Sequence, residues 1–257
     1  MLKLRTHSDI ILNRYLARYE LEACLKKCWK DPDTVTRDFI RFELDLSREK
    51  DKDVMAALKD TRLPSLRKFA IQGLSGVRTQ EDTLLVQKFL KSSIPEDLPT
   101  FWIHNGTGSH WKYLEEYLSC FEYSLKSVTQ EVYIFGFRLS AATLVHLIQL
   151  CSQVQRLSIV NCEIEDGQYN LPLSIPYKIK ELNISSNTCD YDDEDCMNTA
   201  KLDKLFGAIS KTSMKQTLKQ VFVNGDRFPT EDLEDILKKR GLPNVQVSWK
   251  YELRPID

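Results

Sequence analysis

The stretch Val154-Gln155-Arg156-Leu157-Ser158-Ile159-Val160-Asn161-Cys162-Glu163-Ile164 decides the fold of this 257-residue chain. Aliphatic residues occupy every position that the pattern L-x-x-L-x-L-x-x-N/C-x-L reserves for them, and Cys162 occupies its polar position. Apolar residues at every second position are typical of a short strand. The stretch therefore predicts one strand followed by a turn.

The same frame returns in Ile179-Lys180-Glu181-Leu182-Asn183-Ile184-Ser185-Ser186-Asn187, with Asn187 at the polar position. Leu182 lies 25 residues after Leu157, within the ~20 to 29 residues of such repeats. Weaker copies at irregular spacing can be aligned on both sides of the clear pair. The equivalent anchor residues of the seven strands are then Phe69, Phe101, Val132, Leu157, Leu182, Val221 and Val245.

The two clear segments resemble the leucine-rich repeat family, and the helical segments between the strands resemble its ribonuclease-inhibitor-like branch. The resemblance implies an α/β fold, a leucine-rich repeat solenoid with a curved parallel sheet and a mostly helical outer side. The resemblance covers roughly residues 63–250, and the solenoid of about seven irregular repeats is expected to span residues 63–257. It also implies that Cys162 and Asn187 are buried structural groups that bond to backbone carbonyls in the turn after each strand.

Helices are expected between most of the strands, each with one apolar face at helical spacing. Ser109 is the expected N-cap of the helix before the third strand. Residues 166–176 contain two prolines, so this return segment is expected to be extended. The four apolar faces consist of Leu84, Leu85, Val86, Phe89 and Leu90; Trp111, Leu114, Tyr117, Leu118 and Phe121; Leu144, Leu147, Ile148 and Cys151; and Leu202, Leu205, Phe206 and Ile209.

Residues 1–62 are expected to form a separate N-terminal helical segment. The charged sequence between residues 8 and 60 is broken by Asp31-Pro32-Asp33, and its apolar residues have helical spacing. One interpretation is a cap that covers the first coil of the solenoid. The other interpretation is a docking segment that binds a partner.

The composition excludes several classes of protein. With 36 Lys and Arg against 37 Asp and Glu, the chain lacks the positive charge of a nucleic-acid binder. No apolar run approaches the roughly 18 residues of a membrane span, and the N-terminal residues are charged. The seven cysteines are an odd number spread along the chain, which is typical of reduced thiols. A cytoplasmic protein that binds neither nucleic acid nor membrane is expected.

No catalytic or metal-binding motif is apparent, so neither an enzyme nor a cofactor is expected. Residues 105–112 faintly resemble a phosphate loop but lack its G-K-[ST] end, and a turn is the favoured interpretation. Cys24 and Cys28 are spaced to share one helix face and could form half of a metal site. No second pair of cysteines and no nearby histidine is placed to complete a tetrahedral set of ligands. The acidic segment between Cys189 and Cys196 lacks the glycine of a calcium loop and is expected to be a solvated loop without a disulfide.

Function is therefore expected to lie on the outward positions of the strands, because the inward positions form the core. Large aromatic residues at neighbouring outward positions are typical of a protein-binding hot spot. If the alignment of the early strands is shifted by one residue, the same aromatics belong to the core instead. The predicted partner-binding residues are Trp102, His104, Tyr133, Phe135, Arg156, Ser158, Glu181, Asn183 and Phe222.

The sequence thus favours a non-enzymatic adaptor or scaffold that binds a protein through the concave face of its sheet. The alternative is a regulatory subunit or substrate receptor, whose N-terminal helices dock into a larger complex while the repeats select the client. An enzyme regulator of the GTPase-activating type is a third hypothesis. It would need a catalytic arginine, which no motif identifies.

Overall fold

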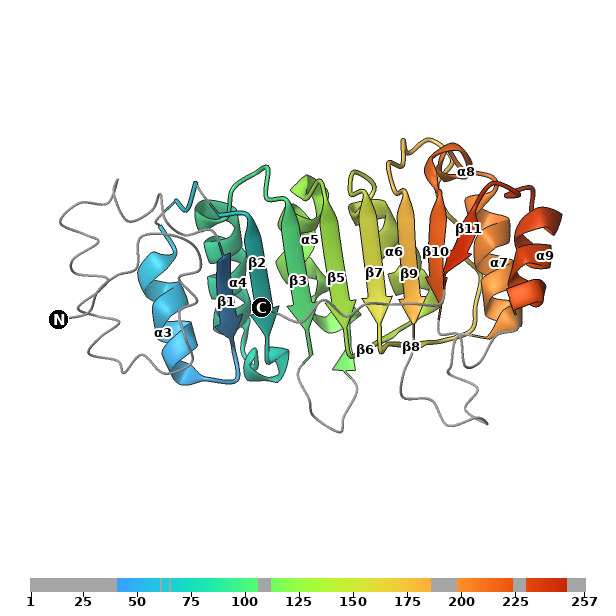
Figure 1. Cartoon of the computed structure of the whole chain (residues 1–257). Coiled ribbons are helices and arrows are strands. Elements are labelled where there is room, and N and C mark those ends of the chain that lie inside the picture. The colour runs from blue at the N-terminus through green and yellow to red at the C-terminus, as the bar shows by residue number, and fades with distance from the viewer. Residues whose placement is uncertain are drawn as a thin grey trace.

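The computed structural model describes residues 41–60, 62–64, 66–105, 112–185, 198–223 and 230–248. Its main feature is an open sheet of eight parallel strands, arranged in the order of the chain (Figure 1). Each strand pairs with the one before it and the one after it in that order, so the sheet grows by one strand at a time. The strands are β1 (Arg41–Asp45), β2 (Lys68–Gln72), β3 (Thr100–His104), β5 (Glu131–Phe135), β7 (Arg156–Val160), β9 (Glu181–Ser185), β10 (Gln220–Val223) and β11 (Gln246–Ser248).

Helices form a second layer behind this sheet in Figure 1, with α3 at one end and α9 at the other. None of the helices in the described ranges is long and apolar enough to cross a membrane. A small parallel sheet of β4 (Lys112–Tyr113), β6 (Phe137–Leu139) and β8 (Glu163–Ile164) follows the ends of three large strands. The helices are α3 (Glu49–Leu58), α4 (Gln80–Ser93), α5 (Glu115–Ser127), α6 (Ala141–Leu150), α7 (Thr199–Ile209), α8 (Met214–Thr217) and α9 (Thr230–Lys239), with a 3₁₀ turn at Leu74–Gly76.

The main core lies between the sheet and the helices. Successive strands place Phe69, Phe101 and Val132 side by side, and the same row continues through Leu157 and Leu182. All five side chains are fully buried. The rings of Phe69 and Phe101 stack with centroids 5.4 Å apart. Residues at every second strand position therefore supply this core, as the alternation in the sequence predicts.

The anchor position of the last strand was predicted wrongly. Val221 of β10 pairs with Val247 of β11, not with Val245. Gly241 has a φ of 72° after α9, and the amide of Val245 donates to the carbonyl of Leu242 in a turn. Because the turn uses the residues up to Val245, the strand begins two residues later than the apolar pattern indicates.

An additional strand lies where the sequence analysis assigned a helix. Residues 41–45 form β1, which pairs with β2 and places Phe42 beside Phe69. The helical assignment of these residues is wrong, although α3 does follow at Glu49–Leu58. The sheet therefore continues across the expected boundary at residue 62. The rest of the predicted N-terminal segment, including Cys24 and Cys28, lies outside the described residues.

The predicted helices agree with the structure in most details. The expected apolar faces of α6 and α7 are buried, and residues 166–176 contain no helix. Leu84 is an exception, because it is 56% exposed on α4. Helix α5 begins at Glu115, after the short strand β4, and its N-cap is Leu114. The prediction that Ser109 is the N-cap of this helix is therefore wrong. Ser109 itself lies outside the described residues.

Cys162 has the structural role that the repeat pattern predicts. Its buried thiol contacts the carbonyls of Ile134 and Val160 and accepts a hydrogen bond from the amide of Phe137 at 3.5 Å. Burial raises the pKa of this thiol to about 12, so it remains protonated at neutral pH. Asn187 and the acidic segment between Cys189 and Cys196 fall outside the ranges that the structure covers.

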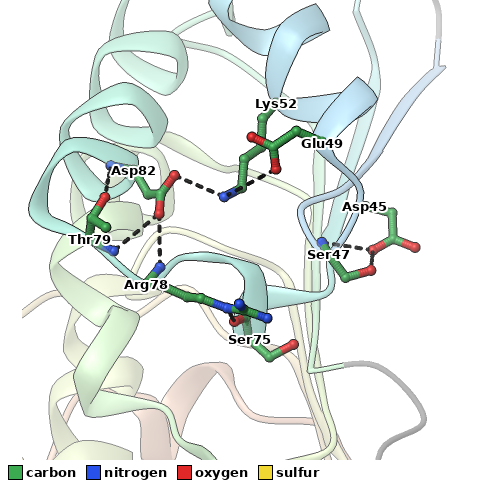
Figure 2. A network of polar contacts seen from close by, with 8 residues as sticks. All are labelled: Asp45, Ser47, Glu49, Lys52, Ser75, Arg78, Thr79 and Asp82. Atoms are coloured by element: carbon green, nitrogen blue, oxygen red, sulfur yellow. Dashed lines mark hydrogen bonds and ion pairs between the residues drawn. The ribbon is translucent and has the colours of Figure 1, made fainter.

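A network of polar contacts joins the first strand and helices (Figure 2). Thr79 and Asp82 form a capping box at the start of α4. Asp82 also accepts a hydrogen bond from the amide of Arg78 and pairs with Lys52 of α3 at 3.0 Å. Desolvation raises the pKa of Asp82, but these hydrogen bonds outweigh it and lower the pKa to about 2. The network thus ties α3 to the N-terminus of α4.

Candidate functional site

The strand residues that alternate with the core residues form a second face of the sheet. We call it the front face, because it is turned toward the viewer in Figure 1, away from the helix layer. Ala70, Trp102, Tyr133 and Val160 form a buried apolar cluster there, with Phe135 packed against it. This front-face cluster is separate from the main core and contains strand residues only.

Three rows of side chains run across the front face, because each strand pairs in register with the next. The first row is polar, the second is mixed, and the third is polar except for Phe135 and Val160. The first row contains Lys68, Thr100, Glu131, Arg156, Glu181 and Gln220; the second contains Glu43, Ala70, Trp102, Tyr133, Ser158, Asn183 and Phe222; and the third contains Asp45, Gln72, His104, Phe135, Val160 and Ser185.

The predicted site residues therefore occupy the same face, and the alternative alignment shifted by one residue is wrong for β3 and β5. Phe101 and Ile103 lie in the main core, whereas Trp102 between them lies in the front-face cluster. Neighbouring strand residues point to opposite faces of a sheet.

Aromatic rings fill the middle of the front face. The ring centroids of Trp102 and Tyr133 are 5.1 Å apart, and those of Tyr133 and Phe135 are 6.3 Å apart with the planes nearly parallel. The ring centroids of His104 and Phe135 are 5.6 Å apart. The ammonium of Lys68 lies 3.1 Å from the centroid of the Trp102 ring, in a cation–π contact.

Outward strand positions are expected to face solvent, but two of these aromatics are buried. Trp102 is 9% exposed and Tyr133 is 4% exposed, and only Phe135 is partly exposed. The two rings pack against each other across β3 and β5, and the ammonium of Lys68 lies over the Trp102 ring. The indole nitrogen of Trp102 is buried without a hydrogen-bond partner among the described residues.

The other half of the front face is polar and buried. Ser158, Asn183 and Ser185 on β7 and β9 are at most 6% exposed. Their side-chain polar atoms make no hydrogen bond within the part of the chain that the structure describes. Such groups nearly always have partners in folded proteins, because an unpaired buried polar group costs about 1 to 3 kcal/mol.

Charged residues line one side of the front face. Arg156 lies between Glu131 and Glu181 in the first row. Its guanidinium is 2.5 Å from the Glu181 carboxylate and 3.7 Å from the Glu131 carboxylate. These side chains are partly exposed, so the ion pairs contribute little stability. They fix the orientation of Arg156 and Glu181, two of the predicted partner-binding residues.

His104 is the titratable group of the aromatic half. Burial, and to a lesser degree the positive charge of Lys68, lowers its pKa from 6.5 to about 4. Its Nε2 atom is buried and has no hydrogen-bond partner among the described residues. His104 is therefore neutral at physiological pH and acts as an aromatic ring in this cluster.

We expect the folded protein to lose stability as the pH falls from about 6.5 to about 4, because the unfolded chain binds a proton to His104 before the folded protein does. Urea unfolding midpoints at pH 7 and pH 4.5 measure this loss. Carboxylates contribute to it as well, so the wild type is compared with His104→Gln. An equal loss of stability in both proteins would contradict the buried, neutral state of His104.

Two further features complete the site. Phe222 of β10 continues the second row and is partly exposed. Glu43 of β1 was missed, because residues 41–45 were assigned to a helix. The strict alternation in Arg41-Phe42-Glu43-Leu44-Asp45-Leu46 was the signal that could have revealed it.

Within the described ranges, no group of three or more histidine, cysteine, aspartate or glutamate side chains could hold a metal ion. Residues 106–111, which include His110, fall outside those ranges, as does His7. Chemically, the front face offers apolar contact, aromatic stacking and polar atoms that have no hydrogen-bond partner in the described part of the chain. These are the properties of a binding surface.

Comparison of the sequence with models of known protein families finds no match. Comparison with curated proteins finds no match either.

Proposed function

We propose that this chain is a leucine-rich repeat protein without catalytic activity, and that it binds a protein partner through the front face. In this proposal the eight parallel strands line the concave side of a solenoid and the helices form its outer side. The repeated strand pattern, the parallel sheet in chain order and the buried thiol of Cys162 support it.

The front-face cluster is the observation that carries the proposal. Trp102, Tyr133 and Phe135 pack together on the side of the sheet away from the helix layer, where a fold of two layers does not need them for its core. Aromatic residues in such clusters provide most of the affinity of protein interfaces. The fixed charges of Arg156 and Glu181 at one side would orient the partner.

The described cysteines support a reducing compartment such as the cytoplasm for this function. Cys120, Cys151 and Cys162 are all buried free thiols. Burial raises the pKa of each of them, which keeps the thiol protonated and unreactive.

We expect Phe135→Ala to weaken the binding of a protein partner by about 2 kcal/mol, roughly a thirtyfold loss of affinity. Phe135 is partly exposed at the edge of the front-face cluster, so a partner can reach it. Proteins captured by the full-length chain are identified first, and their affinities for wild type and variant are then measured by calorimetry.

Leu84→Ala and Tyr123→Ala are matched controls, because both residues are exposed and apolar but lie on helices. Neither substitution should change the affinity. If the helical variants lose the partner and Phe135→Ala keeps it, the binding surface is on the helical side and the proposal is wrong.

A further inference from the structure

The first row of the front face is accessible to a partner from β2 to β10. Its members on these strands are all partly exposed, and Phe135 at the other side of the face is partly exposed as well. A partner that lies on the front face therefore contacts this row directly. The charges in the row then decide which partner fits, because like charges that meet across an interface repel each other.

The charges in the middle of the first row do not balance. Arg156 lies between Glu131 on β5 and Glu181 on β9, so one positive side chain stands beside two negative ones. The residue on the other side of Glu131 is Thr100 of β3, which is uncharged. Together these side chains leave one negative charge on this part of the front face.

Arg156 holds the two carboxylates unequally. Its Nε atom donates to Glu181 at 2.5 Å, whereas its guanidinium lies 3.7 Å from the Glu131 carboxylate, which is longer than a hydrogen bond. No described residue donates a hydrogen bond to this carboxylate, and the Glu131 side chain is 24% exposed. Lys68 of the same row has its ammonium over the Trp102 ring. Glu131 therefore keeps the capacity to accept hydrogen bonds from a partner.

Phe135 provides an apolar contact on the same strand. Glu131 and Phe135 are the first and last residues of β5, and they point to the same face because four positions separate them. At ~3.3 Å per residue they lie about 13 Å apart along the strand. An extended segment aligned with β5 has the same period. Two of its side chains, four positions apart, can therefore contact both residues.

We propose that Glu131 determines the specificity of the front face, and that the partner is an extended protein segment with a basic residue for Glu131 and an apolar residue for Phe135, four positions apart. Arginine fits better than lysine, because its planar donors pair with both oxygens of a carboxylate. Glu131 is not among the partner-binding residues that the sequence predicts. The inference rests on the proposed function, because it specifies the partner of the same surface.

Selection from a library of random peptides displayed on phage tests this chemistry. The full-length wild-type chain is the bait. The enriched peptides should contain an arginine or lysine four positions from an apolar residue. Phe135→Ala should weaken the binding of these peptides, which shows that they bind at the front face.

Substitutions at Glu131 then test the charge contact with one synthetic peptide from the selection. Glu131→Gln should weaken its binding about tenfold, because the carboxylate that pairs with the basic residue is lost. Glu131→Lys should weaken it further by repulsion. Glu122→Lys is the matched control, because Glu122 on α5 is also a partly exposed glutamate in an ion pair, 3.1 Å from Lys126. It changes the net charge equally and should leave the affinity unchanged.

An exchange of charges between protein and peptide separates a direct contact from a general charge effect. A peptide whose basic residue is replaced by glutamate should bind the wild type weakly. Glu131→Lys should restore its binding, and Glu122→Lys should not. Urea unfolding midpoints show that each variant is folded, and Glu131→Gln carries the test if Glu131→Lys does not fold.

The two proposals fail in different ways. If the library yields no peptide whose binding depends on Phe135, the proposed function is wrong and this inference falls with it. If the peptides depend on Phe135 but lack a basic residue, or bind Glu131→Lys as tightly as the wild type, only the chemistry assigned to the partner is wrong. A basic residue whose replacement by glutamate is not rescued by Glu131→Lys also overturns the role of Glu131.

Discussion

Leu157→Ala and Leu182→Ala are each expected to lower the free energy of unfolding by about 2 to 5 kcal/mol. The two side chains are fully buried and adjacent across β7 and β9, between the sheet and the helices. Because packed elements border the site on both sides, the cavity left by the substitution cannot collapse fully. Urea unfolding followed by circular dichroism measures the change.

Leu173→Ala provides the control for these substitutions. Leu173 is 67% exposed, so the same chemical change should leave the unfolding midpoint nearly unchanged. If Leu157→Ala and Leu182→Ala unfold at the wild-type midpoint, the shared row of anchor residues does not form the core.

Phe101→Ala is expected to cost about 3 to 5 kcal/mol of unfolding free energy. Phe101 is fully buried, stacks on Phe69 and meets the edge of Phe121 with ring centroids 5.9 Å apart. The substitution removes these contacts from the centre of the main core. The measurement is again a urea unfolding curve.

Trp102→Ala, at the next residue of the same strand, should cost less than Phe101→Ala although tryptophan is the larger side chain. The side chain of Lys68 lies against the Trp102 ring on the front face and can move into the space that the ring leaves. A larger loss for Trp102→Ala than for Phe101→Ala would contradict the assignment of the two residues to opposite faces.

The sequence contains enough information to predict most of the strands. Along Leu157-Ser158-Ile159-Val160, inward and outward positions alternate with the two-residue period of a strand. This period is a local property of the chain. A shift by one residue would bury Ser158 in the core and expose Leu157, so the pattern determines the register. The same alternation places Trp102 and Tyr133 on the front face.

Local sequence was less informative where turns set the boundaries. Val245 fits the apolar pattern as well as Val247 does, and only the turn after Gly241 decides which of them pairs with Val221. Residues 41–45 show strand alternation, but they lie between charged segments with helical spacing. Their identity as β1 depends on pairing with β2, a contact between residues far apart in the chain.

The sequence alone determined the face on which the residues of most strands lie, because this follows from the two-residue period of a strand. The parallel order of the strands was implied only by the resemblance to leucine-rich repeats. Only the tertiary structure decided that Trp102 and Tyr133 are buried, that His104 has a lowered pKa, and that Ser158 and Asn183 have no hydrogen-bond partner among the described residues. The physical reason is that burial depends on what lies above a side chain. The elements that pack around a side chain come from residues distant in the sequence, which no local period encodes.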